Sequence, residues 1–147
     1  MDERKGINLQ SRVKASFRKQ GLMRFLGAKL LRIEPGYCEI ELPYREELSQ
    51  QHGFFHGGGI AAVIDTAGGY AALSLFEPGV EVLTVEFKIN FLSPAVGEKI
   101  FARGEVVRSG RTLTVTKGEV VAVNKSKEVI CALMQQTIKQ IKKTGKN

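Results

Sequence analysis

A single acidic residue interrupts a long apolar segment in the middle of the chain. The segment runs from Gly57 to Phe76, and Asp65 lies near its centre. The residues that would share its helix surface, three and four positions away, include no basic partner; they are Ala61, Ala62, Gly68 and Gly69. Burying an unpaired carboxylate costs several kcal/mol or forces it to take up a proton. Asp65 therefore predicts a polar cavity in which a carboxylate does chemistry, unless a backbone amide or Thr66 satisfies it.

Three consecutive glycines precede this segment and follow a histidine, in the order His56, Gly57, Gly58, Gly59. At the start of a helix, backbone N–H groups lack intrahelical partners, and the helix dipole adds about half a positive charge. Such a position can bind an anion or a developing oxyanion. The alternative is that the glycines only allow the helix to approach a sheet closely. No Gly-Lys-Ser/Thr sequence follows, which excludes a phosphate loop of the Walker type.

The spacing between these two features predicts a dimer. Eight residues separate Gly57 from Asp65, so they lie about 12 Å apart along one helix. Reacting atoms must come within about 3 to 3.5 Å of one another. Two antiparallel copies of the helix could place the amide end of one beside the carboxylate of the other. We therefore expect an obligate dimer with composite sites.

The remaining pattern predicts one sheet around one helix. The central segment is apolar on every side and too long for one strand, so it favours a buried helix. Six flanking segments have the alternation and turn residues of strands: Lys29 to Glu34, Tyr37 to Leu42, Val82 to Leu92, Lys99 to Arg108, Thr112 to Val123, and Glu128 to Ile138. Their short connections favour antiparallel neighbours. We expect an α+β fold, with a long central helix wrapped by a curved antiparallel sheet of about six strands.

The two ends of the chain differ from its centre in charge. Of a net charge of +7, the whole excess falls within residues 1–32, which carry nine basic and two acidic residues. The pattern from Leu9 to Leu26 is weakly helical. We expect a basic helical leader over residues 1–28 that packs loosely, a domain over residues 29–138, and a basic, frayed tail over residues 139–147.

Composition argues against several classes of protein. The basic leader lacks interleaved aromatic residues, so we expect no nucleic-acid partner. Five glycines and Asp65 make the central segment unsuited to span a membrane. The two cysteines, Cys38 and Cys131, indicate neither a disulfide framework nor a zinc site and favour the cytoplasm. His52 and His56 are four apart, but the glycines around them disfavour a helix and no third ligand is evident unless Asp65 serves, so no metal site is expected.

In combination, these features resemble the hotdog-fold acyl-CoA thioesterases. One helix is wrapped by an antiparallel sheet, an HGG motif begins the helix, and an aspartate follows nine residues after His56. The chain is most similar to the PaaI-like group, over Leu30 to Ile138, including the strand Thr84 to Leu92, Ser93-Pro94 and the turn at Gly110. The resemblance implies hydrolysis of a CoA thioester without a metal or organic cofactor. It also implies a site across a homodimer, with dimers often pairing into homotetramers.

Roles carried over from the resemblance fall on five residues. Asp65 matches the carboxylate that acts as general base or nucleophile. Gly57 matches the residue whose N–H polarises the thioester carbonyl, and His56 matches the histidine that shapes that pocket. Thr84 falls where members carry a Ser or Thr that steadies the attacking water. Gln50 falls where many members have Asn.

Substrate contacts are expected from a wider set of residues. Gly58 belongs to the amide end that faces the substrate. The candidates for CoA phosphates are Arg108, Arg111 and Lys117, and a solvated turn is the alternative reading of them. The candidates for an acyl pocket are Phe54, Phe55, Tyr70 and Leu73, which could equally be core. A non-catalytic acyl-CoA sensor and a hotdog hydratase or dehydratase are the competing functions.

Overall fold

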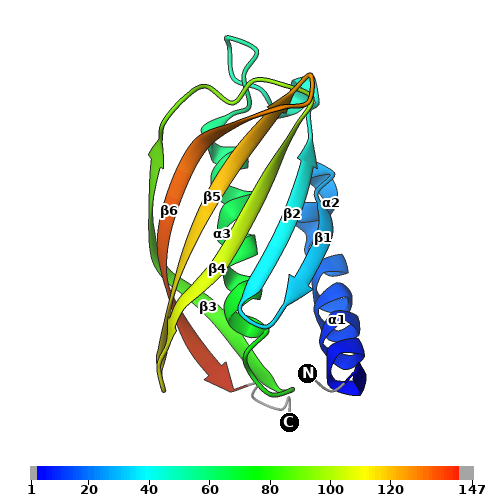
Figure 1. Ribbon diagram of the computed structural model, residues 1–147, viewed down its shortest axis with the longest axis vertical. Coiled ribbons are helices and arrows are strands. Elements are labelled where there is room, and N and C mark those ends of the chain that lie inside the picture. Colours follow the sequence, from blue (N-terminus) through cyan, green and yellow to red (C-terminus); the bar gives the residue numbers. More distant parts are fainter. Residues whose placement is uncertain (1–2, 143–147) are drawn as a thin grey trace.

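Helix α3 (Gly57–Leu73) lies across the concave face of a single curved sheet (Figure 1). The structure is a computed structural model that describes residues 3–142. Two helices that precede the sheet, α1 (Glu3–Arg18) and α2 (Gly21–Leu26), lie beside its β1 edge. The predicted α+β hotdog architecture is confirmed.

The sheet has six strands in the order β1-β2-β4-β5-β6-β3, and every neighbouring pair is antiparallel. The strands are β1 (Lys29–Glu34), β2 (Tyr37–Pro43), β3 (Val80–Phe91), β4 (Lys99–Ser109), β5 (Leu113–Asn124) and β6 (Lys127–Lys142), and a 3-10 turn, η1, spans Glu46–Leu48. The β1–β2 hairpin turns at Pro35-Gly36, where Gly36 has a φ of 78° that favours glycine. Strand β3 reaches its edge position by crossing over to pair with β6.

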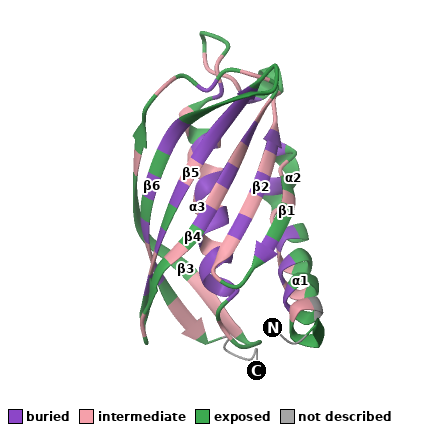
Figure 2. Ribbon diagram, viewed as in Figure 1, coloured by how far each residue is buried: buried purple, intermediate pink, exposed green. Residues whose placement is uncertain are grey.

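The core lies between α3 and the inner face of the sheet, and small residues bring the two together. Val63, Ile64 and Ala67 of α3 are buried, as are the inward residues of β2 and β4 (Figure 2). A Cβ atom added to Gly104 of β4 would lie 2.6 Å from the carbonyl carbon of Ala67. Glycine at this position therefore lets the strand touch the helix backbone, which fixes α3 against the sheet.

The N-terminal helices share this core, which corrects the interpretation of a loosely packed leader. Leu9, Val13 and Phe17 repeat at four-residue spacing along α1, and all three are buried. The ring of Phe17 packs against that of Tyr70 in α3, with centroids 6.1 Å apart. Helix α1 also begins at Glu3, earlier than the predicted Leu9, because its first six residues include a single apolar one, Ile7, too few for a helical pattern.

The last strand of the sheet extends into the predicted C-terminal tail. Strand β6 continues to Lys142, four residues beyond the predicted end at Ile138, because Lys139 to Lys142 pair with the start of β3. The rest of the predicted tail lies outside the described residues.

Cys38 and Cys131 are both free and buried. Within residues 3–142, no helix is long and apolar enough to cross a membrane.

Candidate active site

Polar side chains from two strands hold Asp65, and one from a third strand supports them. Thr84 of β3 donates a hydrogen bond of 2.7 Å from Oγ1 to Oδ1 of Asp65. The side-chain amide of Gln136, on β6, donates to the same Oδ1 and also, at 3.2 Å, to the backbone carbonyl of Asp65. Thr116 of β5 in turn donates to Oε1 of Gln136 at 2.8 Å, which orients the amide. We call Thr84, Gln136 and Thr116 the Asp65 cluster.

This arrangement leaves one carboxylate oxygen free. Among the described residues, Oδ2 of Asp65 accepts no hydrogen bond, whereas Oδ1 accepts two. Asp65 is half-buried, and Thr66 donates instead to the carbonyl of Ala62 at 2.8 Å. The alternative in which Thr66 satisfies the carboxylate is therefore wrong. A carboxylate with one fixed and one free oxygen can accept a proton from water or attack a carbonyl carbon.

Asp65 opens into a cavity of about 240 Å³, which we call the Asp65 pocket. Thr84 of β3 and Gly69 of α3 form its walls near the carboxylate. Farther along α3, the pocket is lined by Tyr70 and Leu73, two of the four predicted acyl-pocket residues. The lining is mainly polar, so the predicted polar cavity around the carboxylate is present.

At the other end of α3, His56 caps the helix and leaves the first amide exposed. The Nδ1 atom of His56 accepts a 2.7 Å hydrogen bond from the N–H of Gly58, so this nitrogen carries no proton. The N–H groups of Gly59 and Ile60 bond to the carbonyl of His56. The N–H of Gly57 has no partner among the described residues. Gly57 is therefore a free donor at the positive end of a helix dipole.

Gly57 lines a second cavity of about 470 Å³, the Gly57 pocket. Gln50, Phe54 and Phe55 line the same cavity, so the structure brings these four predicted residues together. Oε1 of Gln50 accepts from the N–H of His52, and its Nε2 has no partner among residues 3–142. Phe55 is almost fully buried and packs edge-on against Tyr44, so Phe54 is the better exposed of the two rings.

The two pockets are separate in one chain. Within residues 3–142, Asp65 lines the first of these cavities and Gly57 the second, and the rise of the helix places the two residues about 12 Å apart. The predicted residues thus form two groups, with Asp65, Thr84, Tyr70 and Leu73 in one and Gly57, Gln50, Phe54 and Phe55 in the other. Each group supplies half of the chemistry expected of an acyl-transfer site.

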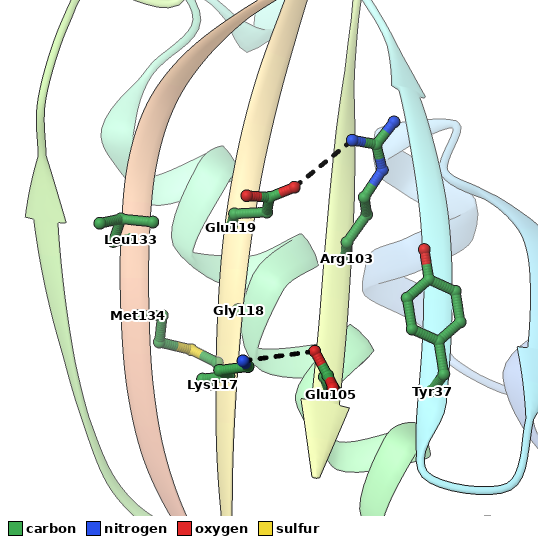
Figure 3. Close-up of a pocket in the computed structure, with 8 residues that line it drawn as sticks. All are labelled: Tyr37, Arg103, Glu105, Lys117, Gly118, Glu119, Leu133 and Met134. Atoms are coloured by element: carbon green, nitrogen blue, oxygen red, sulfur yellow. Dashed lines mark hydrogen bonds and ion pairs between the residues drawn. The ribbon is translucent and has the colours of Figure 1, made fainter. Parts of the chain in front are cut away.

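The predicted phosphate-binding residues lie at neither pocket. Lys117 projects from the face of the sheet opposite α3, where its ammonium lies 3.5 Å from the carboxylate of Glu105 (Figure 3). Arg108 and Arg111 are exposed near the β4–β5 turn. Lys117 lines a cavity of about 450 Å³ on the outer face, where charged side chains such as Arg103 and Glu119 alternate with uncharged ones such as Leu133. The role of these three residues towards CoA stays a prediction.

Gln136 and Thr116 were not identified from the sequence as residues of the site. Both are fully buried polar residues in the inward phase of their strands, as is Thr114 of β5. A polar residue in the buried phase of a strand is the signal that could have found them. It does not reveal their target, because Gln136 lies 71 residues from Asp65 in sequence and meets it only in the fold.

The Asp65 cluster depends on the absence of a side chain at Gly68. A Cβ atom there would collide with Oε1 of Gln136 and lie 2.9 Å from Oγ1 of Thr116. We expect Gly68→Ala to destabilise the protein by about 1 to 3 kcal/mol through overpacking and to lower kcat by displacing the amide. Chemical denaturation and steady-state kinetics measure these two effects.

Gly69→Ala is the matched control for this variant. A Cβ atom at Gly69 meets nothing within 4 Å, and alanine favours a helix over glycine by up to about 1 kcal/mol. We expect this neighbouring substitution to leave stability unchanged or to raise it. Equal destabilisation by the two substitutions would show that the cluster does not need the space at Gly68.

Comparison with known proteins places the chain in a family. Residues 52–128 match the model of the Thioesterase superfamily. A thioesterase family protein from Silicibacter pomeroyi, of known structure, is 45% identical, with a TM-score of 0.89 over 91% of this chain and 98% of that protein. Acyl-coenzyme A thioesterase 13 of Homo sapiens is 32% identical over 111 residues, which cover 74% of this chain and 79% of the human protein.

The fold is also that of a protein with much lower identity. The PaaI protein of E. coli, from the phenylacetic acid degradation operon, is 22% identical, with a TM-score of 0.80 over 90% of this chain and 93% of that protein. The matched residues 52–128 include Gly57, Asp65, Thr84 and Thr116, whereas Gln136 lies beyond them. With a free carboxylate oxygen, a free helix amide and these similarities, the chain belongs to the thioesterase superfamily and is a thioester hydrolase.

Proposed function

We propose that the protein hydrolyses an acyl-CoA thioester to the free acid and CoA, at a site built from two copies of the chain. The free Oδ2 of Asp65, fixed through its other oxygen, is the observation that carries this proposal. The human relative, named an acyl-coenzyme A thioesterase, supports CoA as the thiol. The proposed mechanism combines the Gly57 pocket of one copy with the Asp65 pocket of the other.

The N–H of Gly57 in one copy would donate to the thioester oxygen, where negative charge develops. Gln50 lines the same pocket, and its Nε2 would offer a second donor. Asp65 of the other copy would either take a proton from water as the water oxygen adds to the carbonyl carbon, or attack that carbon itself. Thr84, beside the carboxylate, would position the water. Collapse of the adduct breaks the C–S bond and releases the thiolate, which takes up a proton. If Asp65 attacks the carbon itself, the collapse leaves a mixed anhydride on Asp65, and water then hydrolyses it to the free acid and the regenerated carboxylate.

The β3 edge supports the pairing of two copies. Strand β3 ends the sheet, and its free edge has unpaired backbone groups that favour pairing with another strand. Large apolar side chains on and beside it are exposed, among them Leu83 at 59%, Val85 at 57% and Phe91 at 54%. Thr84 lies in this same strand. A second copy that adds its own β3 here would cover these side chains and bring its α3 towards Asp65.

The first test is release of thiol from a panel of CoA esters. We expect wild-type protein to release one equivalent of CoA and one of free acid from at least one ester, measured with a thiol reagent and by chromatography of the acid. Consumption of an enoyl-CoA without thiol release would favour a hydratase instead. Binding of CoA esters without any turnover would favour a sensor.

The second test is the mass of the active species in solution. We expect light scattering coupled to size exclusion to give at least twice the chain mass of 16.2 kDa, and four times that mass if dimers pair into tetramers. A fully active monomer would overturn the composite site while leaving thioester hydrolysis in place.

A further inference from the structure

The far end of the Asp65 pocket is closed by the N-terminal helix. Ser16 of α1 and Gln20, the N-cap residue of α2, line this end, together with Tyr70 of α3 and Glu81 of β3. Tyr70 connects the two N-terminal residues: its hydroxyl lies 2.9 Å from Oγ of Ser16 and accepts a 3.0 Å hydrogen bond from Nε2 of Gln20. A group of hydrogen-bonding side chains therefore lines a place where a purely aliphatic chain would need apolar walls.

Counting hydrogens shows that this group is incomplete. Ser16 and Tyr70 share one hydrogen bond, and either hydroxyl can be the donor. If Tyr70 donates, the hydrogen of Ser16 is left over; if Ser16 donates, the hydrogen of Tyr70 is left over. In neither case does an acceptor for the remaining hydrogen exist among residues 3–142. One donor is thus available to whatever occupies the pocket.

Tyr70 and Glu81 determine the charge at this end of the pocket. Burial raises the pKa of Tyr70, and the nearby charge of Glu81 raises it further, although the hydrogen bonds from Ser16 and Gln20 act in the opposite direction. The phenol is therefore a neutral donor at physiological pH. Glu81 offers carboxylate oxygens that accept hydrogen bonds, and the two carboxylates of Glu81 and Asp65 make the pocket unfavourable for a negatively charged ligand group.

From this end of the pocket, we infer that the protein selects acyl groups that carry a neutral hydroxyl near their far end. This rests on the proposed thioester hydrolysis at Asp65. A hydroxyl can accept the spare hydrogen of Ser16 or Tyr70 and donate to Glu81, which neither a methyl group nor a carboxylate can do. At about 240 Å³, the pocket has room for an acyl group but not for the nucleotide arm of CoA.

The distance between Asp65 and Tyr70 along α3 indicates the length of the acyl group. Asp65 and Tyr70 are five residues apart, which corresponds to about 7.5 Å of rise along α3. An extended chain advances about 1.2 Å per bond, so about six bonds separate the reacting carbonyl from the hydroxyl. The 6-hydroxyhexanoyl group has this length, and hexanoyl and adipoyl groups are its methyl-ended and carboxylate-ended counterparts.

The test compares kcat/KM of the wild-type protein for the CoA esters of these three acids. A good hydrogen bond to a buried site is worth about 5- to 30-fold. We therefore expect 6-hydroxyhexanoyl-CoA to exceed hexanoyl-CoA by about this factor, and adipoyl-CoA to be the poorest of the three. Equal hydrolysis of the hydroxylated and plain esters would overturn the inference and leave thioester hydrolysis intact. Absence of turnover with every ester would instead overturn the proposed function on which it rests.

A double variant connects the preference to the residues, because either hydroxyl alone would keep a free hydrogen. We expect the double variant Ser16→Ala/Tyr70→Phe to lower kcat/KM for the hydroxylated ester by about 5- to 30-fold, while hexanoyl-CoA stays within about twofold. Tyr37→Phe removes a hydroxyl on the outer face of the sheet, where Tyr37 bonds to Glu39, and should change neither ester. Circular dichroism checks that each variant folds; should the double variant fail, the comparison of the three esters with the wild-type protein carries the test alone. Equal losses on both esters would show a structural role and contradict the inference.

Discussion

Asp65→Asn is expected to lower kcat by about 10² to 10⁴, the usual contribution of a general base or nucleophile in its class. The substitution is nearly isosteric, and the asparagine Oδ1 still accepts from Thr84 and Gln136 as the carboxylate does. The fold should therefore survive, and the loss should appear in kcat with little change in KM. Steady-state thiol release from the best CoA ester measures both constants.

Glu41→Gln serves as the control for charge. Glu41 lies on the outer side of β2 and pairs loosely with Lys99 at 3.7 Å, so its neutralisation should leave kcat unchanged. If Asp65→Asn retained more than about a tenth of wild-type kcat, Asp65 would be neither base nor nucleophile, even if thioester hydrolysis itself were established.

Gly57→Pro is expected to lower kcat by about 10² to 10³, the effect of removing one oxyanion donor. Proline deletes the free N–H but suits this position, the first residue of α3. The preceding residue, His56, already has the extended backbone that a following proline requires, with φ −66° and ψ 135°. Gly57→Ala retains the N–H, and its added Cβ meets only the exposed ring of Phe91, at 3.2 Å. We expect this control to stay within about fivefold of wild type.

A mixed dimer of Asp65→Asn and Gly57→Pro chains tests whether the site is shared. In a composite dimer, one site carries both defects and the other pairs an intact Asp65 with an intact Gly57. The heterodimer, purified through two different tags, should then show about half of wild-type activity. If each site lay within one chain, every site would carry one defect, and the heterodimer would be as inactive as its parents.

Local sequence patterns predicted the central helix, the six strands and the isolation of Asp65. These features depend on nearest neighbours: apolar periodicity, turn residues such as Pro35-Gly36, and the lack of a basic partner on one helix surface. The strand ends were less accurate, as in β6, because three of the four residues from Lys139 to Lys142 have polar side chains, while all four pair through their backbones. The resemblance to a family added Thr84, which no local pattern indicated.

The supports of the carboxylate could not be predicted in this way. Gln136 and Thr116 act on Asp65 only because β5 and β6 cross beneath α3, and their target lies far away in sequence. The role of Ser16 and Gln20 could not be predicted either, because both fall in the leader that was expected to pack loosely. Their contacts with Tyr70 depend on the docking of α1 through Val13 and Phe17.

Helix α1 lies outside residues 52–128, the part of the chain that matches the superfamily model, yet it walls the pocket beside the carboxylate. The parts that break the thioester and the part that meets the far end of the acyl group are therefore encoded in different stretches of the gene. Mutations confined to one short amphipathic helix could diversify substrate choice among descendants of this protein while the hydrolytic apparatus is inherited intact.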